Sequence, residues 1–269
     1  IARRQRQMCI RDRMEVVQWS AEAAPLVDAK LQGKRVFFIA ATLRPETMYG
    51  QTNCFVGPKI EYGAYKVNDT DVYICTERAA RNFAYQGIFD ERGRIECIVN
   101  VPGSALVGSQ LKAPLGVHEQ VYVVPMETVL STKGTGVVTC VPSDSPDDYA
   151  TLMELRKKAE FYKIDPQWVA LDPVPVVQAP GYSDMIAADL VKQLKIQSPK
   201  DKNALTEAKE IAYKQGFYNG RMLQGSFKGE PVTEAKSKVQ KEMINLGLAF
   251  PYAEPEGKII SRSAVSYTH

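Results

Sequence analysis

The amino-acid sequence predicts an α+β fold in which a β-barrel forms the core and helices surround it. Two observations lead to this prediction. Between residues 35 and 141, short runs rich in β-branched and aromatic residues alternate with Gly, Pro, Asn and Asp, which is typical of many short strands. After Pro146 the apolar residues recur at helical spacing instead. A barrel is favoured because closing the short strands on themselves removes exposed sheet edges.

The strand-rich half contains six predicted strands and one predicted helix. The strands cover residues 35–41, 52–56, 72–76, 95–101, 120–125 and 136–141. The segment ERAARNFAY at residues 77–85 has helical spacing and is inserted between two of them.

The second half contains four predicted helices, at residues 147–162, 183–194, 202–215 and 233–246. The first has a clear start signal, because Ser145 can cap the helix, Pro146 suits its first turn and the two following aspartates favour the helix dipole. Gly247 ends the last helix. Residues 192–214 are rich in charge, and we interpret them as a solvated amphipathic helical pair rather than a binding surface.

Composition bounds the class of protein. The chain has 269 residues, 45% hydrophobic and 24% charged, which suits one large globular domain or two small ones. It has no apolar stretch of about 20 residues, so we expect no membrane association. The five cysteines form no CxxC pair and indicate a reducing, cytoplasmic location.

Segments at the two ends of the chain can be encoded by opposite strands of the same short DNA. Residues 8–12 (MCIRD) can be encoded by ATG TGT ATA AGA GAC, and the reverse complement of that DNA encodes VSYTH, the sequence of residues 265–269. We therefore interpret residues 1–13 and 265–269 as sequencing adapter read as protein, although coincidence between two pentapeptides would look the same. Other codons in the source DNA would contradict this interpretation.

This interpretation changes the apparent charge of the protein. The whole chain has a formal net charge of +3, but residues 1–13 carry five arginines and one aspartate, so the rest is close to −1. Net charge therefore gives no support for nucleic-acid binding, and any RNA contact must come from a local patch. His118 is then the only histidine outside the ends, which makes histidine-dependent catalysis and His-rich metal sites poor candidates.

Common cofactor and nucleophile motifs are absent from the sequence. There is no GxGxxG after a strand, no GxxxxGK[ST] and no GxSxG, so the sequence supports neither a dinucleotide site, nor a P-loop, nor a nucleophile elbow.

The first candidate motif follows the predicted strand at residues 35–41 and reads TLRPETMYGQTN. Its proline cannot donate to a sheet ladder, so the chain must bend there. Thr42, Arg44 and Thr47 are thereby placed at a strand end, where functional residues concentrate. Taken alone, the motif favours a polar turn in which Arg44 and Glu46 form a surface ion pair.

The second candidate motif, GTGVVTCVPSDSPDDY at residues 134–149, runs from a Gly turn through a strand into a helix N-terminus. Asp144, Asp147 and Asp148 crowd one turn. Acids there can simply cap the helix, which alone is the simpler explanation. The functional alternative is a carboxylate that binds an ammonium group; the spacing does not suggest a metal site.

Together the two motifs resemble the editing insertion of leucyl-, valyl- and isoleucyl-tRNA synthetases. The segments GQTNCFV, YICTERAARNFAYQG, VPSDSPDDY, LKIQS and GFYNGRML are most similar to eukaryotic-type cytosolic leucyl-tRNA synthetases, and the resemblance runs from about residue 14 to residue 263. It implies the connective polypeptide 1 domain, a β-barrel with surrounding helices that hydrolyses the aminoacyl ester of mischarged tRNA(Leu). The HIGH and KMSKS signatures of the aminoacylation site are absent, so ligase activity is not expected.

The resemblance also implies roles for individual residues. Asp148 matches the aspartate that binds the substrate α-amino group, and Thr47 the threonine that blocks the leucine side chain. Thr42, Leu43 and Arg44 match the stretch around the terminal adenosine, although many bacterial members have Thr where Leu43 stands. The residues expected to line the opposite wall or to meet a phosphate are Thr139, Val141, Ser143, Asp144 and Lys133. Bacterial members usually have Asp where Ser145 stands, so a carboxylate contacting the ribose is either missing or supplied by Asp144.

The resemblance further implies a domain organisation and partners. The expected segments are an adapter tail (1–13), a linker from the catalytic core (14–34), the editing barrel (35–182), a eukaryotic and archaeal-type helical insertion (183–220), an exit helical segment (221–250), a return linker (251–264) and a second adapter tail (265–269). The expected partners are the 3′ end of tRNA(Leu) and the rest of the synthetase, with a multi-synthetase complex as a further candidate. No cofactor is expected for editing, since ATP and Mg²⁺ serve the parent enzyme at a site absent here.

Two alternatives remain open from the sequence. One is the editing domain of a valyl-type synthetase, whose first motif can also read TRPET; Asn53 and the run SDSPDD argue against it. The other is a tRNA-binding module without hydrolytic activity. Identifying which mischarged tRNA is cleaved would distinguish a leucyl-type from a valyl-type domain. Tight tRNA binding without esterase activity would favour the binding module.

Overall fold

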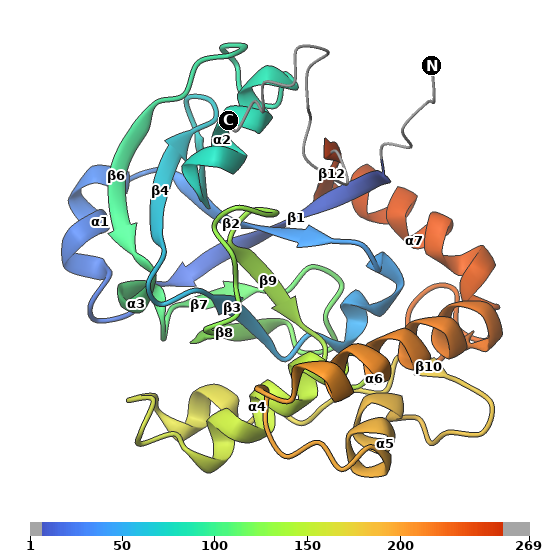
Figure 1. Cartoon of the computed structure of the whole chain (residues 1–269). Helices are drawn as coiled ribbons and strands as arrows, with labels where there is room; N and C mark the ends of the chain where they lie inside the picture. Colours follow the sequence, from blue (N-terminus) through green and yellow to red (C-terminus); the bar gives the residue numbers. More distant parts are fainter. Residues whose placement is uncertain (1–6, 255–269) are drawn as a thin grey trace, which may run out of the picture.

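The computed structural model of the chain describes residues 7–254 and consists of a large mixed sheet with helices packed outside it (Figure 1). The strand order is β6-β4-β5-β2-β1-β7-β8-β3-β9, with β12 paired to β1 beside this path. The strands are β1 (Gln7–Gln18), β2 (Arg35–Thr42), β3 (Asn53–Val56), β4 (Glu61–Lys66), β5 (Asp71–Cys75), β6 (Cys97–Pro102), β7 (Gln110–Lys112), β8 (Gln120–Pro125), β9 (Val137–Cys140) and β12 (Ala249–Glu254).

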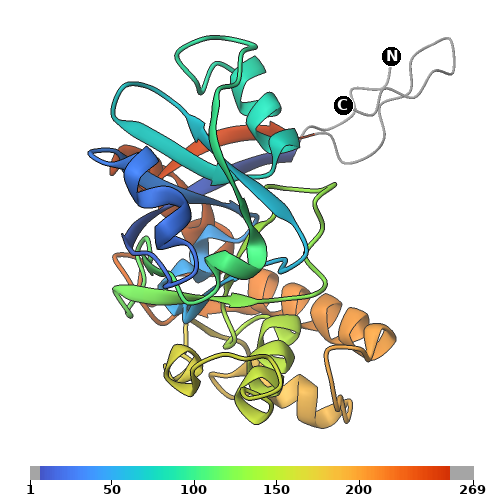
Figure 2. The same ribbon diagram turned by 90° about the vertical axis from the view of Figure 1, so that its left-hand side faces the viewer.

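The helices gather mainly in the second half of the chain, where α4, α5 and α6 lie together at one end of the molecule (Figures 1 and 2). They are α1 (Ala24–Leu31), α2 (Glu77–Tyr85), α3 (Gly103–Leu106), α4 (Pro146–Lys157), α5 (Ile186–Gln193), α6 (Lys202–Lys214) and α7 (Val232–Asn245). Two 3-10 turns, η1 (Pro45–Gly50) and η2 (Pro166–Val169), and a π-helical turn, η3 (Gln215–Asn219), complete the helical elements. A small second sheet pairs β10 (Val177–Gln178) with β11 (Arg221–Met222).

Strand β1 joins the two halves of the large sheet. Its residues 10–15 pair with β2, and Val16 and Gln18 pair with β7 across a shift in register. The sheet therefore bends at β1, and side chains from both halves meet in one apolar core. Phe38 of β2 and Val123 of β8 belong to this core and are fully buried.

Both faces of the central strands are buried, because side chains alternate across a strand. Along β2, Phe38 lies in the core between the two halves of the sheet, whereas Phe37 and Ile39 pack on the other face with residues of α2. Along β3, Cys54 faces the interior, whereas Phe55 packs with residues of α4. One face of the sheet thus lines the apolar core between its two halves, and the other face is covered by helices.

The expected α+β class is confirmed, but the described strands do not form a closed hydrogen-bonded barrel. β6 and β9 end the strand path, and within residues 7–254 no ladder joins them. The turn before β9 instead approaches the ends of β5 and β2: the Thr76 amide donates to the Thr135 carbonyl at 3.0 Å. Gly134 and Gly136 adopt positive φ angles of 63° and 78°, so the chain leaves strand geometry at this point.

The predicted elements agree well with those observed where the periodicity was strong. The helix predicted at residues 77–85 coincides with α2, and the cap predicted at Ser145 is present, since its Oγ accepts from the Asp148 amide at 3.4 Å. The sequence did not reveal β1, β4, β7, β12 or α1. Residues expected in an adapter tail and a linker (7–34) thus contain β1 and α1, and part of the expected return linker (251–254) lies in β12; the outer ends of the chain lie outside the described residues.

Asp12 occupies an unfavourable position in β1. Its side chain is fully buried and its Oδ2 accepts from Thr42 Oγ1 at 2.5 Å, while Oδ1 has no hydrogen-bond partner among the described residues. Burial raises the pKa of Asp12 from 3.8 to about 7, against the opposite effects of Thr42 and of the Arg11 charge.

We expect Asp12→Asn to stabilise the fold at high pH. In the native chain the folded state retains the Asp12 proton between the unfolded pKa near 4 and the folded pKa near 7, so folding free energy is lost as pH rises through that window. At pH 8 the variant should gain on the order of 4 kcal/mol, and at pH 4 almost nothing. Urea unfolding of both proteins at the two pH values measures this, and an equal difference at both would contradict the assigned cause.

Candidate functional site

The two sequence motifs lie side by side because the strands that they contain pair with each other. β3 follows the first motif and runs antiparallel to β9 of the second, with Cys54 opposite Thr139. The Thr52 amide donates to the Cys140 carbonyl at 3.0 Å. The turn η1 and the segment between β9 and α4 are therefore neighbours in space, although about 90 residues separate them.

Gly50 permits this close approach. A Cβ atom on Gly50 would lie 2.8 Å from Val176 Cγ1, 3.1 Å from the Val174 carbonyl oxygen and 3.2 Å from Ser143 Oγ. The first contact is shorter than real Cβ atoms tolerate, so a larger residue would displace η1 or the segment at Val176, and it would also crowd Ser143 of the second motif.

Arg44, Glu46 and Asp144 form a charged cluster where the motifs meet. Arg44 Nε donates to Glu46 Oε1 at 3.0 Å, and the Arg44 guanidinium lies 3.7 Å from Asp144 Oδ1. The side chains of Glu46 and Asp144 are 0% and 2% exposed. The ion pair predicted between Arg44 and Glu46 therefore exists, but it is buried at the motif junction and does not lie on the surface.

The cluster has one more acid than base and is short of hydrogen bonds. Burial lowers the pKa of Arg44, but Asp144 and Glu46 outweigh this effect and raise it, so the guanidinium stays charged. Burial raises the pKa of Asp144 to about 6, while Arg44 lowers it and Glu46 raises it further. Among the described residues, both Asp144 oxygens, Glu46 Oε2 and Arg44 NH2 lack a hydrogen-bond partner. Such buried groups are expected to bind a polar ligand or water.

Asp148 lies in the first turn of α4 and points back toward the strand that precedes it. Its Oδ2 accepts from the Val141 amide at 2.8 Å, and the residue is 8% exposed. Burial raises the pKa of Asp148 to about 7, partly offset by the Val141 hydrogen bond, while Asp147 raises it further. The neighbouring Asp147 is more exposed and lies 3.7 Å from Lys209 Nζ. Of these two aspartates, Asp148 is the one placed to bind a buried cation.

The threonines of the first motif are buried and hydrogen-bonded. Thr47 Oγ1 donates to the Arg44 carbonyl at 2.9 Å and so fixes the turn η1. Thr42, the last residue of β2, donates to Asp12. Leu43, which lies between Thr42 and Arg44, is 52% exposed. Its side chain therefore lies at the rim of the motif.

Of the remaining predicted residues, three are buried and one is exposed. Thr139, Val141 and Ser143 are buried along β9 and the segment that follows it. The Ser143 carbonyl accepts from the Ala187 amide of α5 at 3.1 Å, which ties this wall to the helical insertion. Lys133 is exposed in the turn before β9.

The sequence did not reveal that the helical insertion covers the charged cluster. The Arg44 guanidinium lies 5.8 Å from the centre of the Tyr213 ring in α6. A Cβ on Gly216 of η3 would lie 3.3 Å from the same guanidinium and 3.8 Å from Asp144 Oδ1. The sequence gives only a weak indication of this contact: an aromatic residue at the end of a charged helix, followed three positions later by Gly.

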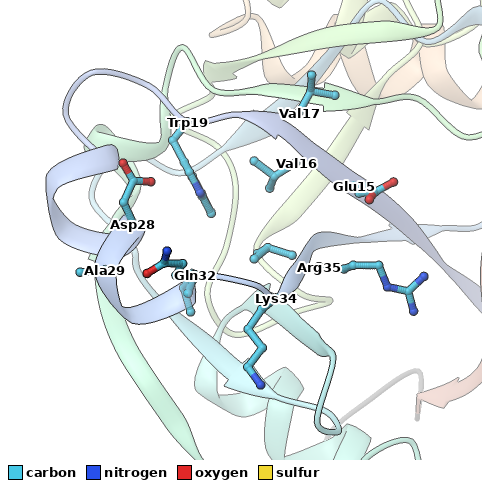
Figure 3. Close-up of a pocket in the computed structure, with 11 residues that line it drawn as sticks. Glu15, Val16, Val17, Trp19, Asp28, Ala29, Gln32, Lys34 and Arg35 are labelled. Atoms are coloured by element: carbon cyan, nitrogen blue, oxygen red, sulfur yellow. The ribbon is translucent and has the colours of Figure 1, made fainter.

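A pocket of about 630 Å³ lies elsewhere, between β1, α1 and the start of β2 (Figure 3). Trp19, Asp28 and Arg35 contribute to its lining, and none of its lining residues belongs to either motif.

In the part of the chain that the structure describes, no group of three or more His, Cys, Asp or Glu side chains is arranged to hold a metal ion. No helix within residues 7–254 is long and apolar enough to cross a membrane.

Comparison with known proteins identifies the family. No protein-family model matches the chain. It is 54% identical to the cytoplasmic leucine–tRNA ligase of Neurospora crassa and 49% identical to that of Saccharomyces cerevisiae, in each case over 93% of this chain. The chain spans only 22–23% of the length of these relatives.

Solved structures match the same part of the synthetase. The crystal structure of GlLeuRS-CP1 is 32% identical and superposes with a TM-score of 0.85, over 92% of this chain and all of that one. The cytosolic leucyl-tRNA synthetase editing domain of P. knowlesi, 24% identical, has the same fold with a TM-score of 0.81, over 93% of this chain and 97% of its own. The chain therefore belongs to the leucyl-tRNA synthetase family and corresponds to its connective polypeptide 1, or editing, domain.

Proposed function

We propose that this domain hydrolyses the ester bond between a non-cognate amino acid and the 3′-terminal adenosine of tRNA(Leu). The observation that carries the proposal is the position of Asp148, a buried carboxylate beside the junction of the two motifs that accepts a hydrogen bond from the Val141 backbone amide. Isoleucine, valine, methionine and norvaline are the candidate amino acids. The aminoacylation reaction is not expected from this chain.

Asp148 would bind the α-ammonium group of the esterified amino acid. A buried carboxylate is costly unless a positive charge or several hydrogen bonds accompany it, and the raised pKa of Asp148 reflects that cost. The substrate ammonium supplies the missing charge. Binding should therefore restore the ionised carboxylate and hold the ester in one orientation.

Hydrolysis of this ester needs little chemical assistance from the protein. The oxygen of water bonds to the ester carbonyl carbon, the bond from that carbon to the ribose oxygen breaks, and the ribose oxygen takes up a proton. An aminoacyl ester is already activated, so placing water and ester together can supply much of the rate. The unpartnered polar atoms of Arg44 and Asp144 are candidates for orienting the water or the ribose.

The other predicted residues receive roles that match their burial. Thr47 would exclude the leucine side chain, and Thr42 and Arg44 would contact the adenosine end. Thr139, Val141 and Ser143 would form the opposite wall. The exposed Leu43 and Lys133 would act at the rim, where Lys133 could meet a phosphate.

The natural partners would be the tRNA(Leu) 3′ end and the remainder of the synthetase, with a multi-synthetase complex as a further candidate. The relatives are named cytoplasmic ligases, in agreement with the expected cytoplasmic location. The near-neutral charge of the chain without its first 13 residues predicts weak binding of tRNA by the isolated domain, since phosphate contacts dominate such affinity.

The test of the proposal is a deacylation assay with the whole chain at high concentration. We expect loss of isoleucine from Ile-tRNA(Leu) and protection of Leu-tRNA(Leu), with Asp148→Ala as the blank. Tight tRNA binding without any ester loss would support a binding module instead.

The pH dependence of the reaction should follow the ionisation of Asp148. Only the carboxylate attracts the substrate ammonium, and the pKa of Asp148 is about 7 in the free domain. We therefore expect kcat/KM to fall roughly tenfold for each pH unit below about 7, and to fall again above about pH 8, where the substrate α-ammonium loses its proton. Single-turnover rates from pH 5 to pH 8.5 measure this; a flat profile would remove Asp148 from the rate-determining interactions.

A further inference from the structure

Three aromatic side chains of the helical insertion form a continuous exposed surface, which we name the aromatic platform: Tyr213, Phe217 and Tyr218. Tyr213 and Phe217 stack with ring centres 5.7 Å apart and planes 9° apart, and Tyr218 meets the edge of Phe217 at 5.0 Å. Tyr213 is 39% exposed and Tyr218 66% exposed, whereas Phe217 is partly buried against the core around η1 and α7.

The aromatic platform is anchored and carries positive charge. Lys236 of α7 lies 5.1 Å from the centre of the Phe217 ring and 6.0 Å from that of Tyr213. Within residues 7–254 no carboxylate forms an ion pair with Lys236, whereas the nearby Lys209 is paired with Asp147. A cation over an aromatic face, free of a carboxylate partner, is suited to a phosphate group.

The aromatic platform is continuous with the proposed hydrolytic site. Tyr213 lies 5.8 Å from the Arg44 guanidinium, so one end of the platform reaches the charged cluster. In Figure 1, α6 runs from α4 toward α7, and η3, which follows α6, contacts α7. An RNA strand whose last nucleoside occupies the site must leave it over an adjoining surface.

We infer that the aromatic platform binds the single-stranded nucleotides immediately before the terminal adenosine of the RNA substrate. A base would stack on the exposed ring of Tyr218, the neighbouring nucleotide would pass the exposed edge of Tyr213, and the Lys236 ammonium would lie near a phosphate. Stacking on aromatic side chains combined with a cationic groove is the common way of binding single-stranded nucleic acid without strong sequence preference. This inference rests on the proposed function, because it takes the end of an RNA as the occupant of the site.

The first test measures binding without hydrolysis. The probe is the unacylated RNA tetranucleotide 5′-ACCA-3′, labelled at its 5′ end and titrated with the whole chain at low salt. Replacing Tyr218 by Ala should weaken binding roughly tenfold, because each stacked base contributes about that much. Tyr218→Phe keeps the ring and should bind like the native chain. Tyr85→Ala, which removes a 65% exposed tyrosine from the distant helix α2, is the matched control.

The second test separates the aromatic platform from the hydrolytic site. An isoleucyl ester of adenosine alone has no nucleotide that could reach the platform, whereas an isoleucyl ester of ACCA has three. We expect Tyr218→Ala to raise KM roughly tenfold for the ACCA ester, with kcat retained, and to leave hydrolysis of the adenosine ester unchanged.

Each outcome decides one question. Absence of ACCA binding by the native chain, or equal ACCA affinity of the native chain and Tyr218→Ala, would overturn the inference even if mischarged tRNA is hydrolysed. Equal losses for both esters would also overturn it, since they would place the effect at the hydrolytic site. Binding of ACCA that depends on Tyr218, without cleavage of any ester, would support the platform and count against the proposed hydrolysis.

Discussion

Asp148→Asn should reduce kcat/KM for deacylation of Ile-tRNA(Leu) at least about 100-fold at pH 8, while the protein becomes more resistant to unfolding. The loss is expected because an ion pair with the substrate ammonium in a buried site is worth a few kcal/mol. The gain is expected because Asp148 ionises in the unfolded state near pH 4 and in the folded state near pH 7. Stability on the order of 4 kcal/mol is therefore lost between those values in the native chain and retained in the variant.

The adjacent aspartate provides the control for this prediction. Asp147→Asn removes the same charge one residue earlier in α4, but Asp147 is partly exposed and paired with Lys209 across 3.7 Å. Its loss should change both stability and turnover little, since exposed ion pairs contribute less than about 1 kcal/mol. If Asp148→Asn and Asp147→Asn reduced turnover equally, the general negative charge of the helix start would be responsible, and Asp148 would have no specific role.

Substitution of Thr47 should change which aminoacyl-tRNA is attacked. If the Thr47 methyl group blocks the branched leucine side chain, Thr47→Ala should admit leucine and speed the hydrolysis of Leu-tRNA(Leu) by roughly 10- to 100-fold. The structure adds a complication, because Thr47 Oγ1 also donates to the Arg44 carbonyl at 2.9 Å. Thr47→Ala therefore removes two interactions at once, the second worth about 1 kcal/mol of stability.

Two further variants separate the methyl group from the hydroxyl. Thr47→Ser keeps the hydrogen bond and removes the methyl, so it should expose Leu-tRNA(Leu) to hydrolysis. Thr47→Val keeps the shape and removes the hydrogen bond, so it should protect Leu-tRNA(Leu) while lowering the unfolding midpoint. Initial rates for leucyl and isoleucyl esters and a urea titration of each variant are the measurements. Continued protection of leucine by Thr47→Ser would show that the methyl group is not the barrier.

The strongest local patterns in the sequence were reliable. α2 was predicted with its observed limits because its apolar residues recur at helical spacing and are buried on one face. The start of α4 was predicted because capping depends on a few adjacent residues, and Ser145 does cap it. Strand β1 was missed because residues 1–13 were assigned to an adapter tail and residues 14–34 to a linker; Arg11, Asp12 and Arg13 also break the pattern of a buried strand, yet Arg11 and Asp12 are buried in the structure.

Long-range pairing decided the geometry of the sheet. The sequence favoured a closed barrel, since closure removes edges, but in the described residues the turn carrying Gly134 and Gly136 meets the end of β5 through a backbone hydrogen bond from Thr76 to Thr135 and forms no strand ladder with it. Register and closure depend on which distant strands meet. The spacing of apolar residues within one strand contains no information about its partner.

The sequence by itself determined the α+β class, the limits of several helices, the two motifs and their resemblance to the leucyl-tRNA synthetase editing domain. Each of these depends on residues that are close to one another in the chain. Only the tertiary structure decided that the ion pair of Arg44 and Glu46 is buried, that Asp144 joins it from the other motif, and that Tyr213 of the helical insertion lies over it. The physical reason is that the burial of this pair and its contacts with Asp144 and Tyr213 arise between segments about 100 or more residues apart, and the pKa of each group follows from that environment rather than from its place in the chain.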